Sequence, residues 1–151
     1  MSESLIRAQI AVILATASGI GVIHDRRRYS DSWDAWFTLM TSGGKVNGWT
    51  INREETPAAY DTNATIARRH SFTIMGFYEI NDTDASETTF QAILDSIFTK
   101  FAGNRTLNGT AQNSGPINIE YVRVDLFGDE LVNRLLHMAQ LTLLVEERVF
   151  I

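Results

Sequence analysis

The 151-residue sequence contains no cysteine and only two prolines. The absence of cysteine excludes disulfides, thiolate metal sites and cysteine nucleophiles, and it fits a protein made in a reducing cytosol. The sequence also lacks a Gly-x-Ser-x-Gly elbow, a Walker-type Gly-Lys-Ser/Thr and a dinucleotide-binding glycine motif. No apolar run approaches the roughly 20 residues that span a bilayer. We therefore predict no catalytic residue, no cofactor and no membrane partner.

Basic residues are fewer than acidic ones: 13 lysines and arginines against 18 aspartates and glutamates give a formal net charge of −5. Proteins whose whole surface binds nucleic acid are usually basic, so such binding would have to rest on local patches. The three histidines, His24, His70 and His137, do not share a metal-ligand spacing, and we predict no metal site. Hydrophobic residues make up 44% of the chain and charged residues 21%, as in ordinary globular domains. We predict one domain over residues 1–151.

Hydrophobic periodicity predicts two long helices, over residues 3–17 and 84–101. The second would begin with a capping-box-like pair, Asp84 and Glu87, and end at Gly103. A short third helix within residues 30–44 would place four apolar side chains on one stripe, at i, i+3, i+4 and i+7. They are Trp33, Trp36, Phe37 and Met40.

Alternation of apolar and polar residues predicts five strands, over residues 21–24, 46–53, 70–80, 117–127 and 135–149. The polar segments 54–67 and 103–116 are predicted to be exposed loops. Strands follow one another without βαβ alternation. We therefore predict an α+β fold, with a mostly antiparallel sheet of four to five strands and two long helices packed on one face.

The stretch GVIHDRRRYSDSWDAWF, residues 21–37, concentrates arginine and tryptophan. These residue types dominate the energetics of protein–protein interfaces. The stripe with Trp33 and Trp36 has to be buried, either against the chain's own sheet or against a neighbouring subunit. Guanidinium groups also bind phosphates, so phosphate contact stays open for this cluster and for Arg68 and Arg69.

Five segments resemble tail terminator (tail completion) proteins of long-tailed bacteriophages and prophages, a group similar in fold to the lambda tail terminator. The segments are VIHDRRRYSDSWDAWF (22–37), GWTINREE (48–55), RRHSFTIMGFYEIND (68–82), FQAILDSIFTKF (90–101) and the final strand into VEERV. The resemblance covers nearly the whole chain in element order and includes no catalytic signature.

This resemblance implies a hexameric ring that caps the growing tail tube, ends its polymerisation and presents a surface for the head connector. DNA would pass through the centre of the ring. The implied partners are copies of the chain itself, the tail tube protein and the head–tail connector protein. The implied location is the virion tail or neck, with the host cytoplasm during assembly. Other neck or head-closure proteins and a small cellular α+β ligand-binding or enzymatic domain remain alternatives.

A ring of this kind needs two different contact surfaces on each subunit. We predict that the aromatic helix with Trp33 and Trp36, together with exposed strand edges, supplies one surface. The polar loops 54–67 and 103–116 are predicted to contact the tube or the connector.

Charged residues supply the remaining hypotheses about the ring. The cluster Arg26, Arg27 and Arg28 is predicted to pair with acidic residues of the next subunit. The acidic residues available for this are Glu54 and Glu55, or Glu146 and Glu147. The second basic pair is predicted to line the channel of the ring; it consists of Arg68 and Arg69.

Overall fold

A computed structural model describes residues 2–151, which form three α-helices and eight β-strands. The helices are α1 (Glu3–Ala15), α2 (Trp33–Leu39) and α3 (Ser86–Ala102). The strands are β1 (Val22–His24), β2 (Thr41–Ser42), β3 (Lys45–Glu55), β4 (Ala58–Thr62), β5 (Thr65–Glu79), β6 (Asn113–Ser114), β7 (Asn118–Gly128) and β8 (Asn133–Phe150). Among these residues, no helix is long and apolar enough to cross a membrane.

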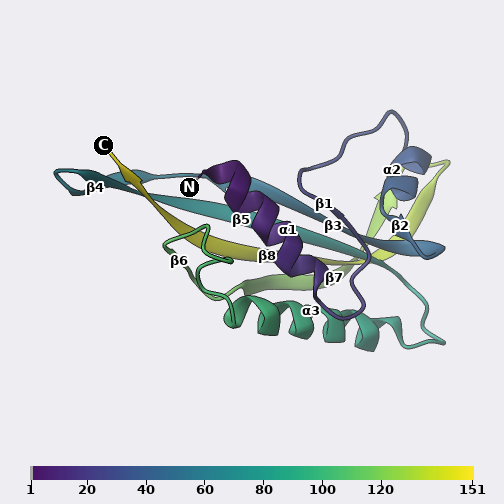
Figure 1. The fold of residues 1–151 in the computed structure, drawn as a ribbon. Helices are drawn as coiled ribbons and strands as arrows, with labels where there is room; N and C mark the ends of the chain where they lie inside the picture. Colours follow the sequence, from purple (N-terminus) through teal and green to yellow (C-terminus); the bar gives the residue numbers. More distant parts are fainter. Residues whose placement is uncertain (1) are drawn as a thin grey trace.

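All eight strands belong to one curled sheet (Figure 1). The strand order is β1-β3-β5-β8-β6, while β2 pairs with β3, β4 with β5 and β7 with β8. The central pair, β5 and β8, is continuous from Thr65↔Phe150 to Glu79↔Leu136. The pairs are antiparallel except β1 with β3, which is parallel and makes the sheet mixed.

This architecture shows that the predicted fold class is wrong. Instead of four to five mostly antiparallel strands with two long helices, the chain has eight strands in a mixed sheet and three short helices, with 45% strand and 25% helix. The parallel pair arises because residues 25–44, including α2, form the crossover that parallel neighbours require. Three short strands, β2, β4 and β6, were not predicted because their sequences carry no alternation.

The segment 54–67, predicted to be a loop, is mostly a β-hairpin. β3 continues to Glu55, and β4 pairs antiparallel with the first residues of β5 across a turn at residues 63–64. Pro57 lies between β3 and β4, and its carbonyl accepts a hydrogen bond from the Arg69 amide at 3.0 Å. Proline is compatible with this edge position because it need not donate to the ladder. Residues 103–116 are mainly turns, with β6 near their end.

The predicted capping box of α3 is also absent from the described structure. The N-cap is Ala85, which has a left-handed conformation (φ 54°) and makes no side-chain cap hydrogen bond. The first helical residue, Ser86, instead accepts a hydrogen bond from the Asn81 amide through its Oγ, at 2.9 Å. The loop before the helix therefore folds back on the helix start, and Asp84 bonds to Asn81 rather than to the helix.

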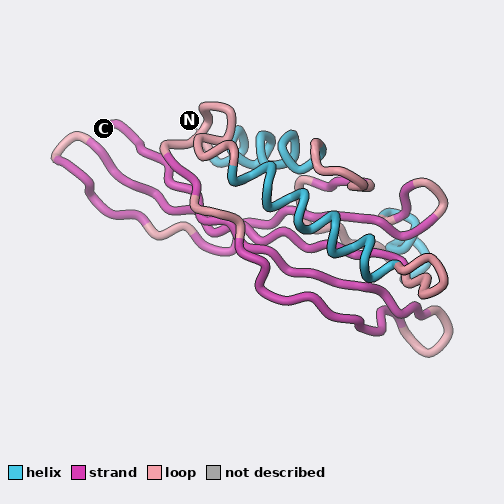
Figure 2. Tube along the Cα trace, turned by 90° about the horizontal axis from the view of Figure 1, so that it is seen from below, coloured by secondary structure: helices cyan, strands magenta, loops and turns pink. Residues whose placement is uncertain are grey.

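Each face of the sheet carries its own core, because successive side chains of a strand point to opposite faces. On one face, here called the two-helix face, α1 and α3 pack on β3, β5 and β8; Figure 2 shows the two long helices together on one face of the sheet. The core there includes Ile6, Ile10, Leu14, Trp49, Phe72, Ile74, Phe90, Leu94, Ile97, Leu141 and Leu143. On the other face, the α2 face, α2 covers one end of the sheet. The core there consists of Phe37, Met40, Val46, Phe77, Leu136 and Met138.

Trp49 is the largest fully buried side chain and lies on Gly76 of the neighbouring strand. A Cβ atom on Gly76 would overlap the Trp49 ring. We expect Gly76→Ala to lower the free energy of unfolding by about 1–3 kcal/mol through overpacking, measured by urea denaturation.

Gly103→Ala is the matched control for this change. Its added Cβ would lie 3.7 Å from the nearest atom, and its φ of −83° suits any residue. We expect a change below about 0.5 kcal/mol. Equal destabilisation by both substitutions would contradict the close packing of Trp49 on Gly76.

Candidate functional site: the arginine–tryptophan groove and the arm

The segment between β1 and α2 forms one wall of a groove on the α2 face. A cavity of about 410 Å³ lies between Arg28, Tyr29, Trp33 and Phe127. A second depression, of about 290 Å³, continues over the sheet. Its lining includes Arg27, Arg28, Trp36, Thr50, Met75 and Gln140. We call these two depressions together the arginine–tryptophan groove, because Arg28 and Trp36 line both of them.

His24 fixes the position of Arg28 at this groove. The Arg28 guanidinium donates to Nδ1 of His24 at 2.9 Å, and Nε2 of His24 lies 2.8 Å from the carbonyl of Leu39. Since a guanidinium only donates, Nδ1 must accept and Nε2 must carry the proton. Within residues 2–151, no carboxylate forms an ion pair with Arg28. Its charge is therefore available to a group outside the chain.

The other two arginines of the cluster pair within their own chain. Arg26 bonds to Asp25 at 3.0 Å, and Arg27 lies 3.6 Å from Glu54. Both pairs are about half exposed, so each contributes little to stability. The structure thus pairs Arg27 with Glu54 within one subunit, whereas the prediction placed this pairing between subunits. Glu55 is exposed and, among the described residues, has no ion-pair partner.

The tryptophans of α2 are half-buried in the chain's own α2 core. Trp36 stacks on Phe127 with ring centroids 5.8 Å apart and meets Phe77 edge-on at 5.0 Å. Trp33 meets Trp36 edge-on at 5.6 Å. Of the two options left open by the sequence, burial against the chain's own sheet is the one the structure shows. Only the exposed parts of these rings remain to line the groove.

At the other end of the molecule, the sheet extends beyond both long helices (Figures 1 and 2). We call this extension the arm. It consists of β4, residues 65–69 of β5 and residues 146–150 of β8. All five residues of β4 are exposed. Both faces of the arm carry uncovered apolar groups, since Tyr60 and Phe150 are each 79% exposed.

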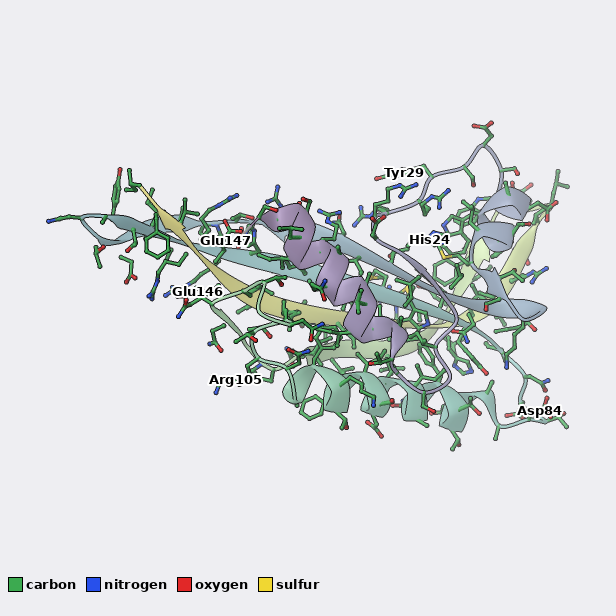
Figure 3. All side chains as sticks on the ribbon, viewed as in Figure 1. His24, Tyr29, Asp84, Arg105, Glu146 and Glu147 are labelled. Carbon is green, nitrogen blue, oxygen red and sulfur yellow. The ribbon has the colours of Figure 1, made fainter. Side chains whose placement is uncertain are left out.

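Arg68 and Arg69, the predicted channel-lining residues, lie in the arm and point to opposite faces. Arg68 is 3.5 Å from Glu147, and Arg69 is 3.8 Å from Glu146 (Figure 3 labels both glutamates). Each pair joins residues directly opposite each other on β5 and β8. The side chain of Arg69 is 71% exposed. The acidic residues predicted to serve the next subunit thus pair across the sheet of their own chain.

A buried polar cluster lies at the base of the arm. His70 is fully buried, and its Nε2 lies 3.3 Å from a carboxylate oxygen of Glu147, whose side chain is only 2% exposed. The hydroxyl of Thr56 lies 3.0 Å from Nδ1 of His70. Because the carboxylate only accepts, Nε2 donates and Nδ1 accepts from the hydroxyl. Arg68 balances the buried carboxylate charge.

A second exposed apolar surface, here called the distal patch, lies on the β7–β8 hairpin at the end opposite the arm. Val124 and Leu126 of β7 and Leu135 of β8 share the two-helix face, because Leu126 pairs with Leu135 and Val124 with His137. These three side chains are 51–60% exposed, and Leu131 in the turn is 93% exposed. Alternation within β7 is visible in the sequence, but the sequence does not show that helices leave this end uncovered.

Within residues 2–151, no three histidine or acidic side chains are grouped to hold a metal ion. No protein-family model and no curated protein matches the chain. The tail-terminator resemblance therefore stays a prediction.

The buried His70 gives a pH dependence. Burial lowers the pKa of His70, although hydrogen bonding to Glu147 opposes the shift. The unfolded chain therefore takes up a proton first, and the free energy of unfolding falls as the pH drops below about 6.5, by up to about 1.4 kcal/mol per pH unit. We expect His70→Gln, whose amide offers one donor and one acceptor, to lower this slope in denaturant titrations between pH 7 and pH 5; the rest of the slope comes from His137, whose pKa is also lowered by burial. Parallel slopes for the two proteins would show that His70 is not the titrating group.

Proposed function

We propose that the protein is a structural component of a bacteriophage or prophage particle. In this proposal, copies of the chain form a hexameric ring that caps the tail tube, ends its polymerisation and provides the surface for head joining. The protein acts in the virion tail or neck, after assembly in the host cytoplasm. The arm carries the proposal, because a surface that the chain's own core leaves uncovered needs a partner.

The energetic argument starts from the arm's lack of a core. A few strands are stable in water only when a hydrophobic face is covered, and the arm has no helix on either face. Its outer edge, β4, also presents unpaired backbone groups, which invite pairing with another chain. Association with another copy of the chain can shield the apolar faces of the arm and pair the open edge of β4.

The distal patch supplies the second surface that a ring needs. It lies at the opposite end of the molecule from the arm, and the two surfaces have different shapes and sequences. A contact between two different surfaces is heterologous, and it closes into a ring when the rotation between neighbours allows. The arginine–tryptophan groove and residues 103–116 remain for the tail tube and connector proteins. Arg69, whose side chain is 71% exposed, is proposed to face the channel through which DNA passes, while Arg68 points to the opposite face of the arm and pairs with Glu147.

One observation favours the rival function, a small ligand-binding domain. The arginine–tryptophan groove combines a cavity of about 410 Å³ with aromatic walls and an arginine without an acidic partner. Pockets of this size hold small molecules. The two functions predict different oligomeric states of the protein, because ligand binding in this groove does not require a second copy of the chain.

Light scattering coupled to size-exclusion chromatography tests the proposed function directly. We expect the wild-type chain to reach a mass near six times the 16.9 kDa of one chain as its concentration rises. Tyr60→Asp places a charge on the arm and is expected to raise the concentration needed for assembly about tenfold or more.

Val12→Asp is the control, because Val12 is an exposed apolar residue on α1 outside the arm and the distal patch (52% exposed). We expect this variant to assemble like the wild type. A wild-type chain that stays monomeric at its highest soluble concentration would contradict the proposal and favour the ligand-binding function.

Substitutions in the arginine cluster distinguish an assembly protein from a nucleic-acid binder. We expect Arg26→Ala with Arg28→Ala to leave ring assembly unchanged, because the proposed contact surfaces between copies are the arm and the distal patch, while any DNA binding by the acidic chain stays weak and unchanged. The measurements are light scattering and DNA titration at several salt concentrations. A drop in DNA affinity with a salt slope flatter by up to about two would instead identify a nucleic-acid binder.

A further inference from the structure

We infer that the free edge of β7 receives the arm of a second copy, with β4 of that copy adding as an antiparallel strand. This inference rests on the proposed self-assembly and names the surfaces that meet. It follows from four features of the sheet: the unpaired edge of β7, the outer edge of β4, the directions of these two strands, and the side chains on the two-helix face.

The first feature is the unpaired edge of β7. In the described chain, β7 pairs only with β8, so its opposite edge is open along Asn118–Gly128. Native proteins protect such edges with proline or with charges aimed along the edge. β7 contains no proline. Two of its three charged residues, Arg123 and Asp125, pair with each other at 3.4 Å on the α2 face, and the third, Glu120, accepts a hydrogen bond from Thr142 of β8. The two-helix face of the same edge carries Val124 and Leu126.

The second feature is the outer edge of β4. Within residues 2–151, β4 pairs with β5 alone, on the side of the sheet opposite to β7. The arm also has an apolar row on the two-helix face, formed by Tyr60, Ile66 and Val149 at directly opposed positions on its three strands. Tyr60, at the edge end of this row, is 79% exposed.

The strand directions fix how the two edges meet. β4 is antiparallel to β5, β5 to β8 and β8 to β7, so β4 and β7 run in opposite directions. A second copy that is displaced sideways and along the strands, without being turned over, brings its β4 against β7 as an antiparallel neighbour. Its two-helix face then lies on the same side as that of the first copy.

The side chains agree with this arrangement. When the two-helix faces are continuous, Tyr60 of one copy lies beside Val124 or Leu126 of the other. Cross-strand pairs of aromatic and aliphatic residues are favourable. The apolar row of the arm would therefore continue into the distal patch, and both unpaired edges would be paired together.

The competing arrangement pairs β7 with β7 of a second copy around a two-fold axis. It would also bury Val124 and Leu126, but it would leave the arm bare in both copies. It would close as a dimer, whereas β4 on β7 leaves one free arm and one free β7 edge for further copies. We choose the arm as the partner of the β7 edge because this pairing satisfies both the β4 edge and the β7 edge.

Disulfide trapping tests the inference cleanly, because the chain has no cysteine of its own. Two single-cysteine variants, Tyr60→Cys and Leu126→Cys, are mixed, oxidised mildly and separated on a non-reducing gel. Tyr60→Cys with Val124→Cys is run in parallel, because either residue can face Tyr60 in the pairing. The control is Tyr60→Cys with Arg123→Cys, since Arg123 lies on the same strand but on the opposite face. Circular dichroism checks that each variant is folded.

We expect one of the two test pairs to form the mixed dimer about fivefold or more above the control. If the wild type assembles but neither pair exceeds the control, or if Leu126→Cys mainly cross-links to itself, the inference is overturned and the proposed function stands. If the wild type remains monomeric in light scattering, the proposed function fails and the inference fails with it.

Discussion

The long antiparallel ladder between β5 and β8 is the constraint on which the rest of the structure depends. It involves all 15 residues of β5, which span about 50 Å at roughly 3.3 Å per residue. The longest helix, α3, has 17 residues and spans only about 25 Å at 1.5 Å per residue. Helices of this length cover the middle of the ladder and cannot cover both ends. The exposed arm is a consequence of this mismatch at one end, and the exposed distal patch lies on the β7–β8 hairpin at and beyond the other end of the ladder.

The arm nevertheless has a defined orientation, because polar groups fix it where the helices stop. The buried His70 and Glu147 form a hydrogen-bonded cluster with the partly exposed Thr56 and Arg68 at its base. Such a cluster is costly unless every member is satisfied, so it favours one geometry of the strands that carry it. An arm whose base is fixed in this way loses less conformational freedom on association than an unrestrained one.

The sequence predicts the elements that alternation or helical spacing encodes. The strands around Phe72–Ile74 and Leu141–Leu143 and the helices α1 and α3 are confirmed for this reason. β4 was missed because its side chains are exposed on both faces and only pairing with β5 makes it a strand. The pairing of Arg27 with Glu54, and the burial of Trp36 against Phe127, depend on contacts between distant segments. Local patterns cannot show whether such groups meet within one chain or between two.

Amide hydrogen exchange read by mass spectrometry tests the central claim most directly, because it reports backbone pairing strand by strand. If the arm and β7 are covered by another copy, residues 58–66 and 118–128 exchange quickly at low concentration and become protected as the mass rises, while the β5–β8 centre stays protected throughout. Protection of the arm in a monomer, or an arm that exchanges quickly in the assembled particle, would contradict the account.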